Sequence, residues 1–313
     1  MLRYALRRIA VAVPLLIAAT AISFAVLQLL PGNPVAVLTF GTQASPAEVA
    51  SIRASLGLNE PVIDQYFIFL GHLLQGNLGT SYLNQQSVAS EITTRIPYTL
   101  ELAGGALVVA LAVGLPSGLL AARYRNTVVD RAVTSLSVLG VAVPYFWLGL
   151  LMVLVFAVTL HWFPALGAGG PKSLVLPAVS LGIGYAALIT RLFRASLIDE
   201  LEKPYVRFAE ARGVPRRRIF LLAVTKGASG PVLTGLGIQI GNMLSGAAAT
   251  EVIFGRPGIG SLFVQAILNK DVPTIQGLIV LVTAIYIVAN LVVDLGKAWI
   301  DPRVRVYLAG QSV

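Results

Sequence analysis

The sequence predicts an all-α membrane protein whose chain crosses the bilayer six times. Hydrophobic residues make up 56% of its 313 residues and charged residues only 12%, whereas a soluble domain carries about a quarter charged residues. The mean hydropathy is +0.81. The apolar residues also gather in long uninterrupted runs, which indicates that most of the chain is surrounded by lipid.

The distribution of charge excludes several other classes of protein. The net charge of +9 would suit a nucleic-acid partner, but the positive residues stand at the edges of apolar runs and not in a basic soluble domain. We therefore expect no nucleic-acid partner. The chain has no cysteine, and His72 and His161 are too far apart for a zinc motif. We expect neither a metal site nor a cofactor in this chain.

The first predicted element is a membrane helix. Arg3, Arg7 and Arg8 precede an uncharged run from Ile9 to Leu30. A signal peptide begins in the same way, but this run of roughly 22 residues is longer than the apolar core of about 7–15 residues expected there. At about 1.5 Å per residue the run reaches about 33 Å and can cross a bilayer. Residues 1–30 are predicted to form the cytoplasmic N-terminus and a retained first span.

Residues 31–97 are too polar to cross a membrane, and we predict that they form an external segment. The prolines of PGNP (31–34) break the first helix. Ser45 and Glu48 form a capping box around Pro46, so a short helix is expected to start there and to stop near Gly57.

A second short helix is predicted from Val62 to Leu74. Its apolar side chains Ile63, Phe67, Leu70 and Leu74 recur at helical spacing and share one face. We expect this amphipathic helix to lie partly on the membrane surface.

The remaining spans form a predicted membrane core at 98–305, followed by a tail at 306–313. We place each span boundary at a charge, because a charged residue at the bilayer centre costs about 2.5–3.5 kcal/mol. The predicted spans cover 102–122, 132–160, 174–189, 232–254 and 276–299. Pro116 is expected to kink the second span, and Pro144 lies within the third. The fifth is dense in small residues between Gly237 and Glu251, as close helix contacts require.

The positive residues support this topology. Of the 23 lysines and arginines, all but five fall on the cytoplasmic side of the six-span arrangement. The exceptions are Arg53, Arg95, Lys172, Arg256 and Lys270. The positive-inside rule therefore predicts that both termini and the loop 195–226 are cytoplasmic.

Three acidic residues at or near spans could in principle carry ions or protons. Glu101 and Glu251 are expected near the outer ends of their spans, where water reaches them. Asp294 lies one turn before Lys297, and we expect these two to form a local ion pair.

The stretch from Tyr205 to Pro231 is the most heavily charged part of the chain. Residues 208–212 are good helix formers, Gly213 can end the helix, and Pro215 can start another. The pattern predicts a helix, a glycine break and a second helix along the membrane surface. The alternative is a solvated loop that only satisfies the positive-inside rule.

This stretch resembles the EAA loop of binding-protein-dependent ABC importer permeases. The resemblance rests on an alanine-rich turn followed by glycine and a downstream proline. The residues that it implies as a coupling site are Tyr205, Arg207, Ala209, Glu210, Ala211, Arg212, Gly213, Arg216 and Pro231. Glu210 and Arg212 stand where the family varies. In that family the loop forms a coupling helix that docks into a groove on the ATP-hydrolysing subunit.

Four further segments, in the same order along the chain, resemble permeases for dipeptides, oligopeptides, nickel and glutathione. They are Leu56–Tyr82, Ile96–Leu102, Glu251–Gly260 and Asp301–Arg305. The resemblance implies a type I ABC importer permease fold in a multi-pass protein of the cell membrane. It also implies a second, homologous permease subunit, two ATP-binding cassette subunits that bind ATP and magnesium, and an external substrate-binding protein. Di- and oligopeptides are the first cargo expected, followed by nickel chelates and glutathione.

Motifs for chemistry are missing from the sequence. It contains no GxxxxGK[ST] loop for nucleotide phosphates, no HExxH and no GxSxG. We therefore expect a transport subunit with no catalytic residues of its own. The alternative is an energy-independent channel or a secondary transporter, although the two related halves that many secondary transporters carry are not apparent. A structural scaffold of a membrane complex is disfavoured by the ordered motifs.

Overall fold

The computed structural model describes residues 2–29, 35, 45–55 and 59–300, and within its helices the side chains at 2–12, 29, 216, 221–223, 238, 240, 244 and 294–300 lie outside the description. The predicted PGNP break, the stop near Gly57, the Asp294–Lys297 pair, the DPRVR segment and the C-terminal tail therefore fall outside the described residues. Every regular element in the described ranges is a helix. Their single extended pairing is an isolated bridge between Thr80 and Ser87.

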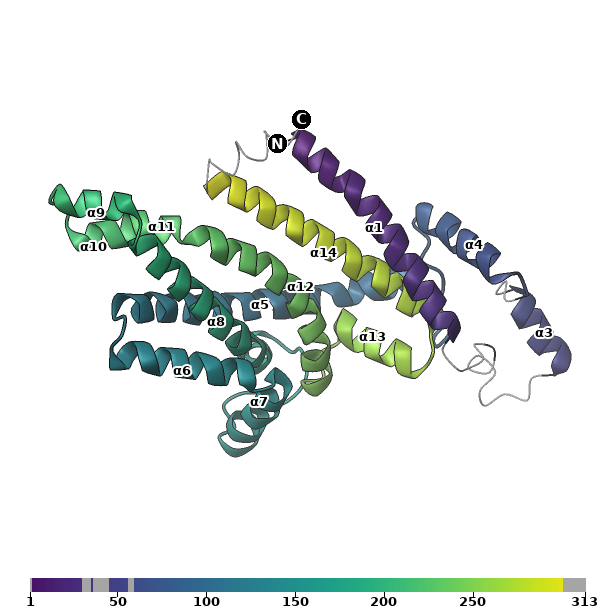
Figure 1. Cartoon of the computed structure of the whole chain (residues 1–313). Coiled ribbons are helices and arrows are strands. Elements are labelled where there is room, and N and C mark those ends of the chain that lie inside the picture. Colours follow the sequence, from purple (N-terminus) through teal and green to yellow (C-terminus); the bar gives the residue numbers. More distant parts are fainter. Residues whose placement is uncertain (1, 30–34, 36–44, 56–58, 301–313) are drawn as a thin grey trace.

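The N-terminal part contains one long helix and two short ones. Their bounds are α1 Leu2–Leu29, α3 Pro46–Ser55 and α4 Val62–Leu74. The predicted capping box is confirmed, because the Ser45 N–H donates to Glu48 Oε2 (2.7 Å) and the Glu48 N–H donates to Ser45 Oγ (3.3 Å). These bonds lower the pKa of Glu48. Helix α4 lies beside α1 (Figure 1).

The centre of the molecule is a pair of long helices, α5 (Val88–Arg123) and α8 (Pro171–Leu201). Small residues let their backbones approach closely. A Cβ atom at Gly114 would lie 2.8 Å from the carbonyl oxygen of Ala186, and one at Gly182 would lie 2.7 Å from that of Ala106. Because residue numbers rise together along the contact, the two helices run in parallel.

Helix α5 begins at Val88 and so extends into the predicted external segment. Pro97 and Pro116 both lie inside it. A proline costs a helix one hydrogen bond, but packing on neighbouring helices can compensate for that loss.

The predicted third span is divided into two parts. Helix α6 (Val128–Ala142) is followed by α7 (Tyr145–Met152) and the π-helix η1 (Val153–Thr159), and the two parts meet at 95°. Val143 is extended and Pro144 cannot donate the hydrogen bond that would continue α6. The predicted span at 132–160 is therefore sharply bent at Pro144, and the two parts can be one broken span or a re-entrant loop.

The C-terminal half contains a helical hairpin formed by α9, α10 and η2, the short helix α11 and three further helices. Their bounds are α9 Pro204–Ala211, α10 Arg216–Arg218, η2 Ile219–Val224, α11 Thr225–Gly227, α12 Ser229–Ile253, α13 Ile259–Leu268 and α14 Val272–Ile300. Helix α13 was not predicted. The part of the chain from Thr225 to Ile253 bends by 46° between Met243 and Ser245.

By length and composition, three described helices can cross a membrane, and the two bent pairs raise this number to five. The three are α5, α8 and the part of α14 from Val272 to Val293. Helix α1 is a further candidate, and its apolar part with described side chains runs from Val13 to Gln28. The count of six stays a prediction.

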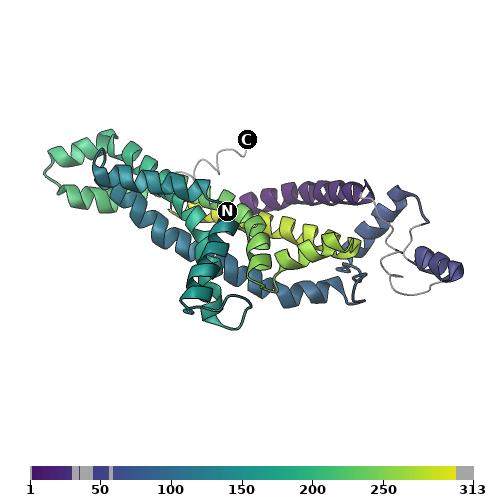
Figure 2. The ribbon, with the colours of Figure 1, turned by 90° about the horizontal axis from the view of Figure 1, so that it is seen from below.

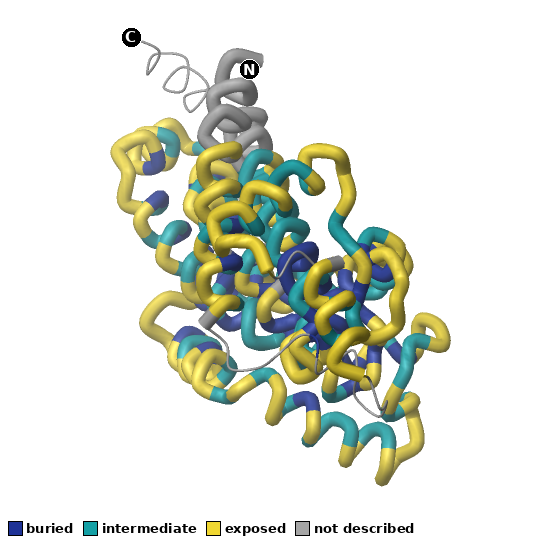
Figure 3. Tube along the Cα trace, turned by 90° about the vertical axis from the view of Figure 1, so that its right-hand side faces the viewer, coloured by how far each residue is buried: buried dark blue, intermediate teal, exposed yellow. Residues whose placement is uncertain are grey.

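The molecule is elongated, with different elements at its two ends. Figures 1 and 2 both show α9 and α10 at one end and α3 at the other. Buried residues gather in the middle of the bundle, and the outer helices are largely exposed (Figure 3). The main core joins side chains of α5, α8, α12 and the hairpin, including Leu102, Leu181, Ile189 and Phe220.

Candidate functional site

The predicted coupling stretch forms a helical hairpin at one end of the bundle. Helix α9 ends at Ala211, and the chain turns through Gly213, whose φ is +76°. In that conformation an L side chain is strained, which explains the glycine. The Gly213 N–H donates to the Glu210 carbonyl (2.9 Å) and the Val214 N–H to the Ala209 carbonyl (3.1 Å), which completes the end of the helix. The predicted helix, glycine break and helix are confirmed.

The inner face of the hairpin belongs to the protein core. Val206 on α9 is buried, as are Ile219, Phe220 and Val224 on η2. All four belong to the same cluster as Leu197 on α8. The hairpin is therefore fixed to the membrane helices by apolar packing, and its orientation is set by that packing.

A buried carboxylate fastens the first turn of α9. Glu200 at the end of α8 accepts hydrogen bonds from Lys203 Nζ (2.5 Å) and from the Tyr205 hydroxyl (2.9 Å). Desolvation by partial burial raises the pKa of Tyr205 to about 12, and the hydrogen bond to Glu200 and its negative charge act in the same direction. A Cβ atom at Gly227 would collide with the Glu200 carboxylate, so any larger residue there would displace this group from its present position.

The outer face of the hairpin is exposed. Phe208 is 64% exposed, and the Arg212 guanidinium lies over its ring, 5.6 Å from the centroid. Arg207, Glu210 and Ala211 are exposed beside them. An exposed aromatic ring with a stacked arginine is the kind of surface that protein partners bind.

Eight of the nine residues predicted for this site lie on the hairpin. Tyr205, Arg207, Ala209, Glu210 and Ala211 are on α9, Arg212 and Gly213 are in the turn, and Arg216 starts α10. Ala209 faces inward, half-buried against the core. Pro231 lies in the first turn of α12, beyond η2 and α11.

Two ion pairs that the sequence analysis did not predict connect α6 and the loop before it to α8 and the residue that follows it. They lie at the same end of the bundle as the hairpin. Asp130 of α6 accepts two bonds from the Arg194 guanidinium of α8, at 2.6 and 2.8 Å. Arg125 Nη1 donates to Glu202 at 2.9 Å. These partners stand 64 and 77 residues apart, and no local pattern in the sequence connects them. By contrast, the three-residue spacing of Glu200 and Lys203 could have been noticed.

At the far end of α12 from the hairpin, the turn that leads into α13 contains a buried polar network. Glu251 Oε1 accepts from the Thr99 hydroxyl (2.5 Å), and Oε2 accepts from the Ser261 N–H (2.9 Å). Arg256 is 2% exposed, and its Nη2 donates to Glu101 (3.1 Å). Glu251 is fully buried, so the expectation that water reaches it is wrong. The cause is α13, which covers the end of α12.

A second polar cluster joins the N-terminal segment to the last helix. Asp271 precedes α14 and accepts bonds from the Ser81 hydroxyl (2.5 Å) and the Tyr82 N–H (3.0 Å). Burial, together with the charge of Asp271, raises the pKa of Tyr82 to about 12. The residues just before α5 are thus fastened to the start of α14.

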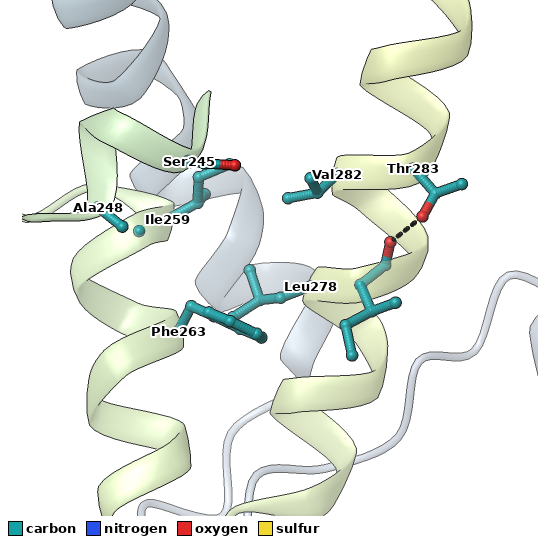
Figure 4. A pocket seen from close by; sticks show the side chains of 9 residues that line it. Ser245, Ala248, Ile259, Phe263, Leu278, Val282 and Thr283 are labelled. Atoms are coloured by element: carbon teal, nitrogen blue, oxygen red, sulfur yellow. Dashed lines mark hydrogen bonds between the residues drawn. The ribbon is translucent and has the colours of Figure 1, made fainter. Parts of the chain in front are cut away.

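Helices α12, α13 and α14 line a partly open pocket of about 300 Å³ (Figure 4). Its lining is almost entirely apolar, with Val282 facing Ser245 across the gap and Phe263 beside Leu278. The hydroxyl of Thr283 is turned to the Ile279 carbonyl (2.7 Å). No charged side chain is among the nine residues that line it. Among the described residues, no group of three or more acidic or histidine side chains could hold a metal ion.

Comparison with protein families gives two matches that together cover nearly the whole chain. Residues 114–306 match the model described as the binding-protein-dependent transport system inner membrane component. Residues 1–103 match the model for the N-terminal part of the same kind of membrane component.

Individual relatives are similar over their full length. The chain is 35% identical to the dipeptide transport system permease protein DppB of Alkalihalophilus pseudofirmus, over 97% of this chain and 100% of that protein. It is 36% identical to the glutathione transport system permease protein GsiC of an Escherichia coli strain, over 97% and 99%. Among solved structures, the inward-facing MetNI methionine ABC transporter aligns with a TM-score of 0.57 at 17% identity. That alignment covers 67% of this chain and 96% of the MetNI chain, and it shows a shared fold.

Proposed function

The chain belongs to the family of binding-protein-dependent transport system inner membrane components, and we propose that it is the peptide-importing permease of an ATP-driven transporter, coupled to its ATPase through the α9–η2 hairpin. In this proposal a second permease completes the pathway, two ATPase subunits bind and hydrolyse ATP, and an external binding protein delivers the cargo. ATP binding moves the hairpin, and the membrane helices follow between inward- and outward-open states.

The observation that carries the proposal is the two-sided construction of the hairpin. Its inner face is part of the main core through Val206 and Phe220. Its outer face presents Phe208 and Arg212 to the surroundings. A partner bound to the outer face therefore acts directly on the helices that the inner face contacts. A loop that served only as a topology signal would not need this inner packing.

The placement of the chain ends favours the proposed orientation. Helix α1 starts, and α14 ends, toward the end of the bundle from which α9 projects (Figure 1). The positive residues of the hairpin lie at that end as well, as the positive-inside rule requires of a cytoplasmic surface. We assign this end to the cytoplasm and the α13 end to the outside.

Replacing Phe208 by aspartate tests the docking surface. The side chain is 64% exposed, so the protein should fold while an ATPase groove loses an aromatic contact and meets a negative charge. Tagged native and Phe208→Asp proteins are purified in mild detergent and compared for co-purifying ATPase. We expect the ATPase to accompany the native protein and to be lost from the variant.

Thr127→Asp is the matched control. Thr127 is exposed and stands at the N-cap position of α6 near the same end of the bundle, where its side chain makes no cap bond and donates to the Tyr124 carbonyl (2.6 Å), and aspartate is at least as good an N-cap as threonine. This variant should retain the ATPase. If Phe208→Asp retains it equally well, or if no ATPase accompanies the native protein, the coupling role is refuted and an energy-independent channel or secondary transporter becomes the better reading.

Peptide cargo is supported by the names of relatives, which include dipeptide, di/tripeptide and glutathione permeases. Uptake of a labelled dipeptide and of labelled glutathione, in cells with and without the gene, distinguishes the two. We expect uptake of the labelled dipeptide to fall when the gene is removed. A fall in glutathione uptake alone would overturn the peptide assignment but would leave the importer assignment standing.

The N-terminal segment 31–97 is proposed to meet the binding protein or to cap the pathway. Deletion of Leu56–Tyr82 tests this role by uptake, but it also removes the bonds from Ser81 and Tyr82 to Asp271. A deletion limited to α3, Pro46–Ser55, leaves those bonds intact and is the cleaner test. Unchanged uptake in both deletions would refute the role.

A further inference from the structure

Helix α4 contacts α1 at positions that lie deep along the apolar run of α1. The Tyr66 hydroxyl lies 3.1 Å from the Ile17 carbonyl oxygen and 3.1 Å from the Thr20 hydroxyl. Phe24 packs on the rings of Tyr66 and Phe69, with centroids 5.5 and 6.4 Å apart. The contacts therefore extend over Ile17 to Phe24 of α1.

The depth of these positions follows from helix geometry. Arg8 is the last charge before the apolar run. At about 1.5 Å per residue, Ile17 lies about 14 Å and Phe24 about 24 Å beyond it, inside a hydrocarbon layer about 30 Å thick. A helix that touches α1 there lies at the depth of the acyl chains and not above the membrane.

The polar atoms of α4 on this side are paired within the protein, as hydrocarbon demands. Besides the Tyr66 bonds, Gln65 Nε2 donates to the Glu60 carbonyl (2.8 Å), and its Oε1 accepts from Gln28 Nε2 (3.3 Å). Pairing of this kind is unnecessary for a helix surrounded by water.

A separate face of α4 carries an exposed apolar stripe. Ile63 is 69% exposed, Phe67 63% and Leu74 89%, with the half-buried Leu70 between them. The neighbouring surface of α1 is also apolar and exposed, through Ile22 and Val26. At the depth of acyl chains, two adjoining exposed apolar surfaces are suited to lipid.

The other exposed positions of α4 are partly polar. Asp64 and His72 lie away from the stripe, and both are exposed. The helix is therefore two-faced, with an apolar side and a side that carries ionisable groups. This pattern is typical of helices embedded at the edge of the bilayer.

We propose that α4 is embedded in the membrane, with the stripe of Ile63, Phe67, Leu70 and Leu74 immersed in the acyl chains of the leaflet at the Leu29 end of α1. The occupant of the stripe is lipid. This inference requires only that α1 spans a membrane, so its failure leaves the proposed coupling function standing, and the reverse is also true.

The absence of cysteine from the chain makes site-directed spin labelling direct. Single cysteines are introduced as Phe67→Cys and Leu74→Cys on the stripe, as Asp64→Cys and His72→Cys off the stripe, and as Ile22→Cys for the lipid-exposed surface of α1. The full transporter carrying each label is reconstituted in phosphatidylcholine vesicles. Collision rates of the nitroxide with oxygen, which concentrates in hydrocarbon, and with a water-soluble nickel chelate are then measured.

We expect the ratio of oxygen to nickel collisions at 67 and 74 to match that at 22 and to exceed that at 64 and 72 several-fold. A ratio at 67 and 74 that favours nickel means that water covers the stripe and overturns the proposal. Slow collisions with both reagents mean that a protein covers it and also overturn the proposal. Because all the labelled positions are exposed, the labels do not disturb a packed core, and quenching of a fluorophore on the same cysteines by lipids with brominated chains gives an independent measure of depth.

Discussion

The turn after α9 lies near the start of α12 and the turn after α12 lies at the other end of that helix (Figure 1), and the two turns are packed in opposite ways. At Gly213 an added Cβ atom would meet nothing within 4 Å. At Gly258 it would meet the Glu251 carboxylate, and at Gly260 it would meet the backbone of Ala248. Glycine is required at the first turn by its φ angle and at the second by the close approach of neighbouring atoms.

The exposed turn after α9 leaves a surface that a partner can bind. The buried turn after α12 connects two of the protein's own helices. Most polar groups in the buried turn are paired within the chain, because burial of an unpaired polar group is costly; the exception is Arg256 Nε, which is buried without a hydrogen-bond partner. Those in the exposed turn can be paired with water until a partner arrives. Changes in the buried turn should therefore affect folding, and changes in the exposed turn should affect association.

The largest effect is expected from Glu251→Ala. It leaves the Thr99 hydroxyl and the Ser261 N–H without their acceptor, at a cost of about 1–3 kcal/mol for each buried group. Thermal unfolding of the purified protein in detergent should show a marked fall in Tm. Glu251→Gln keeps one acceptor oxygen and similar volume, and should lose less. Equal Tm values for the alanine and glutamine variants would mean that these bonds contribute little.

A smaller loss of stability is expected from Gly260→Ala. The added methyl group meets Ala248 at 2.4 Å from its Cα atom, and overpacking of this kind costs about 1–3 kcal/mol. Gly104→Ala on α5 is the matched control, since nothing lies within 4 Å there and alanine should add about 0.5–1 kcal/mol of helix stability. The two variants should move Tm in opposite directions. A shift in the same direction would contradict the close packing of α13 on α12.

Phe208→Ala should leave folding almost unchanged while it weakens ATPase binding. Substitutions at exposed positions usually change stability by less than about 0.5 kcal/mol, and Phe208 is 64% exposed. Tm and the amount of co-purifying ATPase are measured on the same samples. Tyr124→Ala removes another exposed ring near that end and should affect neither. A fall in Tm as large as that of Gly260→Ala would abolish the contrast between the two turns.

The smallest effect concerns the pH dependence of the hairpin. Tyr205 has a pKa of about 12 in the folded protein, above the ordinary 10.0. A raised pKa means that its stabilisation is complete below pH 10 and is lost as the pH rises from 10 to 12. A spin label at Ala211→Cys should become more mobile across that range.

The same label in a Tyr205→Phe protein is the control, because every other titrating group is shared by the two proteins. The difference between the two mobility curves should open between pH 10 and pH 12. Parallel curves throughout would show that the Tyr205–Glu200 bond does not hold the start of α9.

Local patterns predicted the parts of the structure that depend on neighbours in the sequence. The capping box of Ser45 and Glu48 involves residues three positions apart, and both of its bonds are present. The break at Gly213 depends on one backbone angle that favours glycine. Such features require no knowledge of the rest of the chain.

Features that depend on distant residues could not be predicted in this way. The burial of Glu251 depends on α13 and on Thr99, which is 152 positions away. Prolines were equally ambiguous, because Pro97 and Pro116 lie inside α5 whereas the chain bends by 95° at Pro144. The sequence around a proline does not specify whether neighbouring helices will hold the chain straight.

The close pairing of α5 with α8 has a mechanical consequence. Helix α5 has 36 residues, which gives it a length of about 54 Å, and backbone atoms of the two helices approach each other at Gly114, Gly118 and Gly182. The close contact of the two backbones resists sliding of α5 along α8, and the packed pair bends less than either helix would alone. A force applied near Tyr124 is therefore transmitted along the paired part of α5, from Gly118 to Gly105, as movement of one rigid unit.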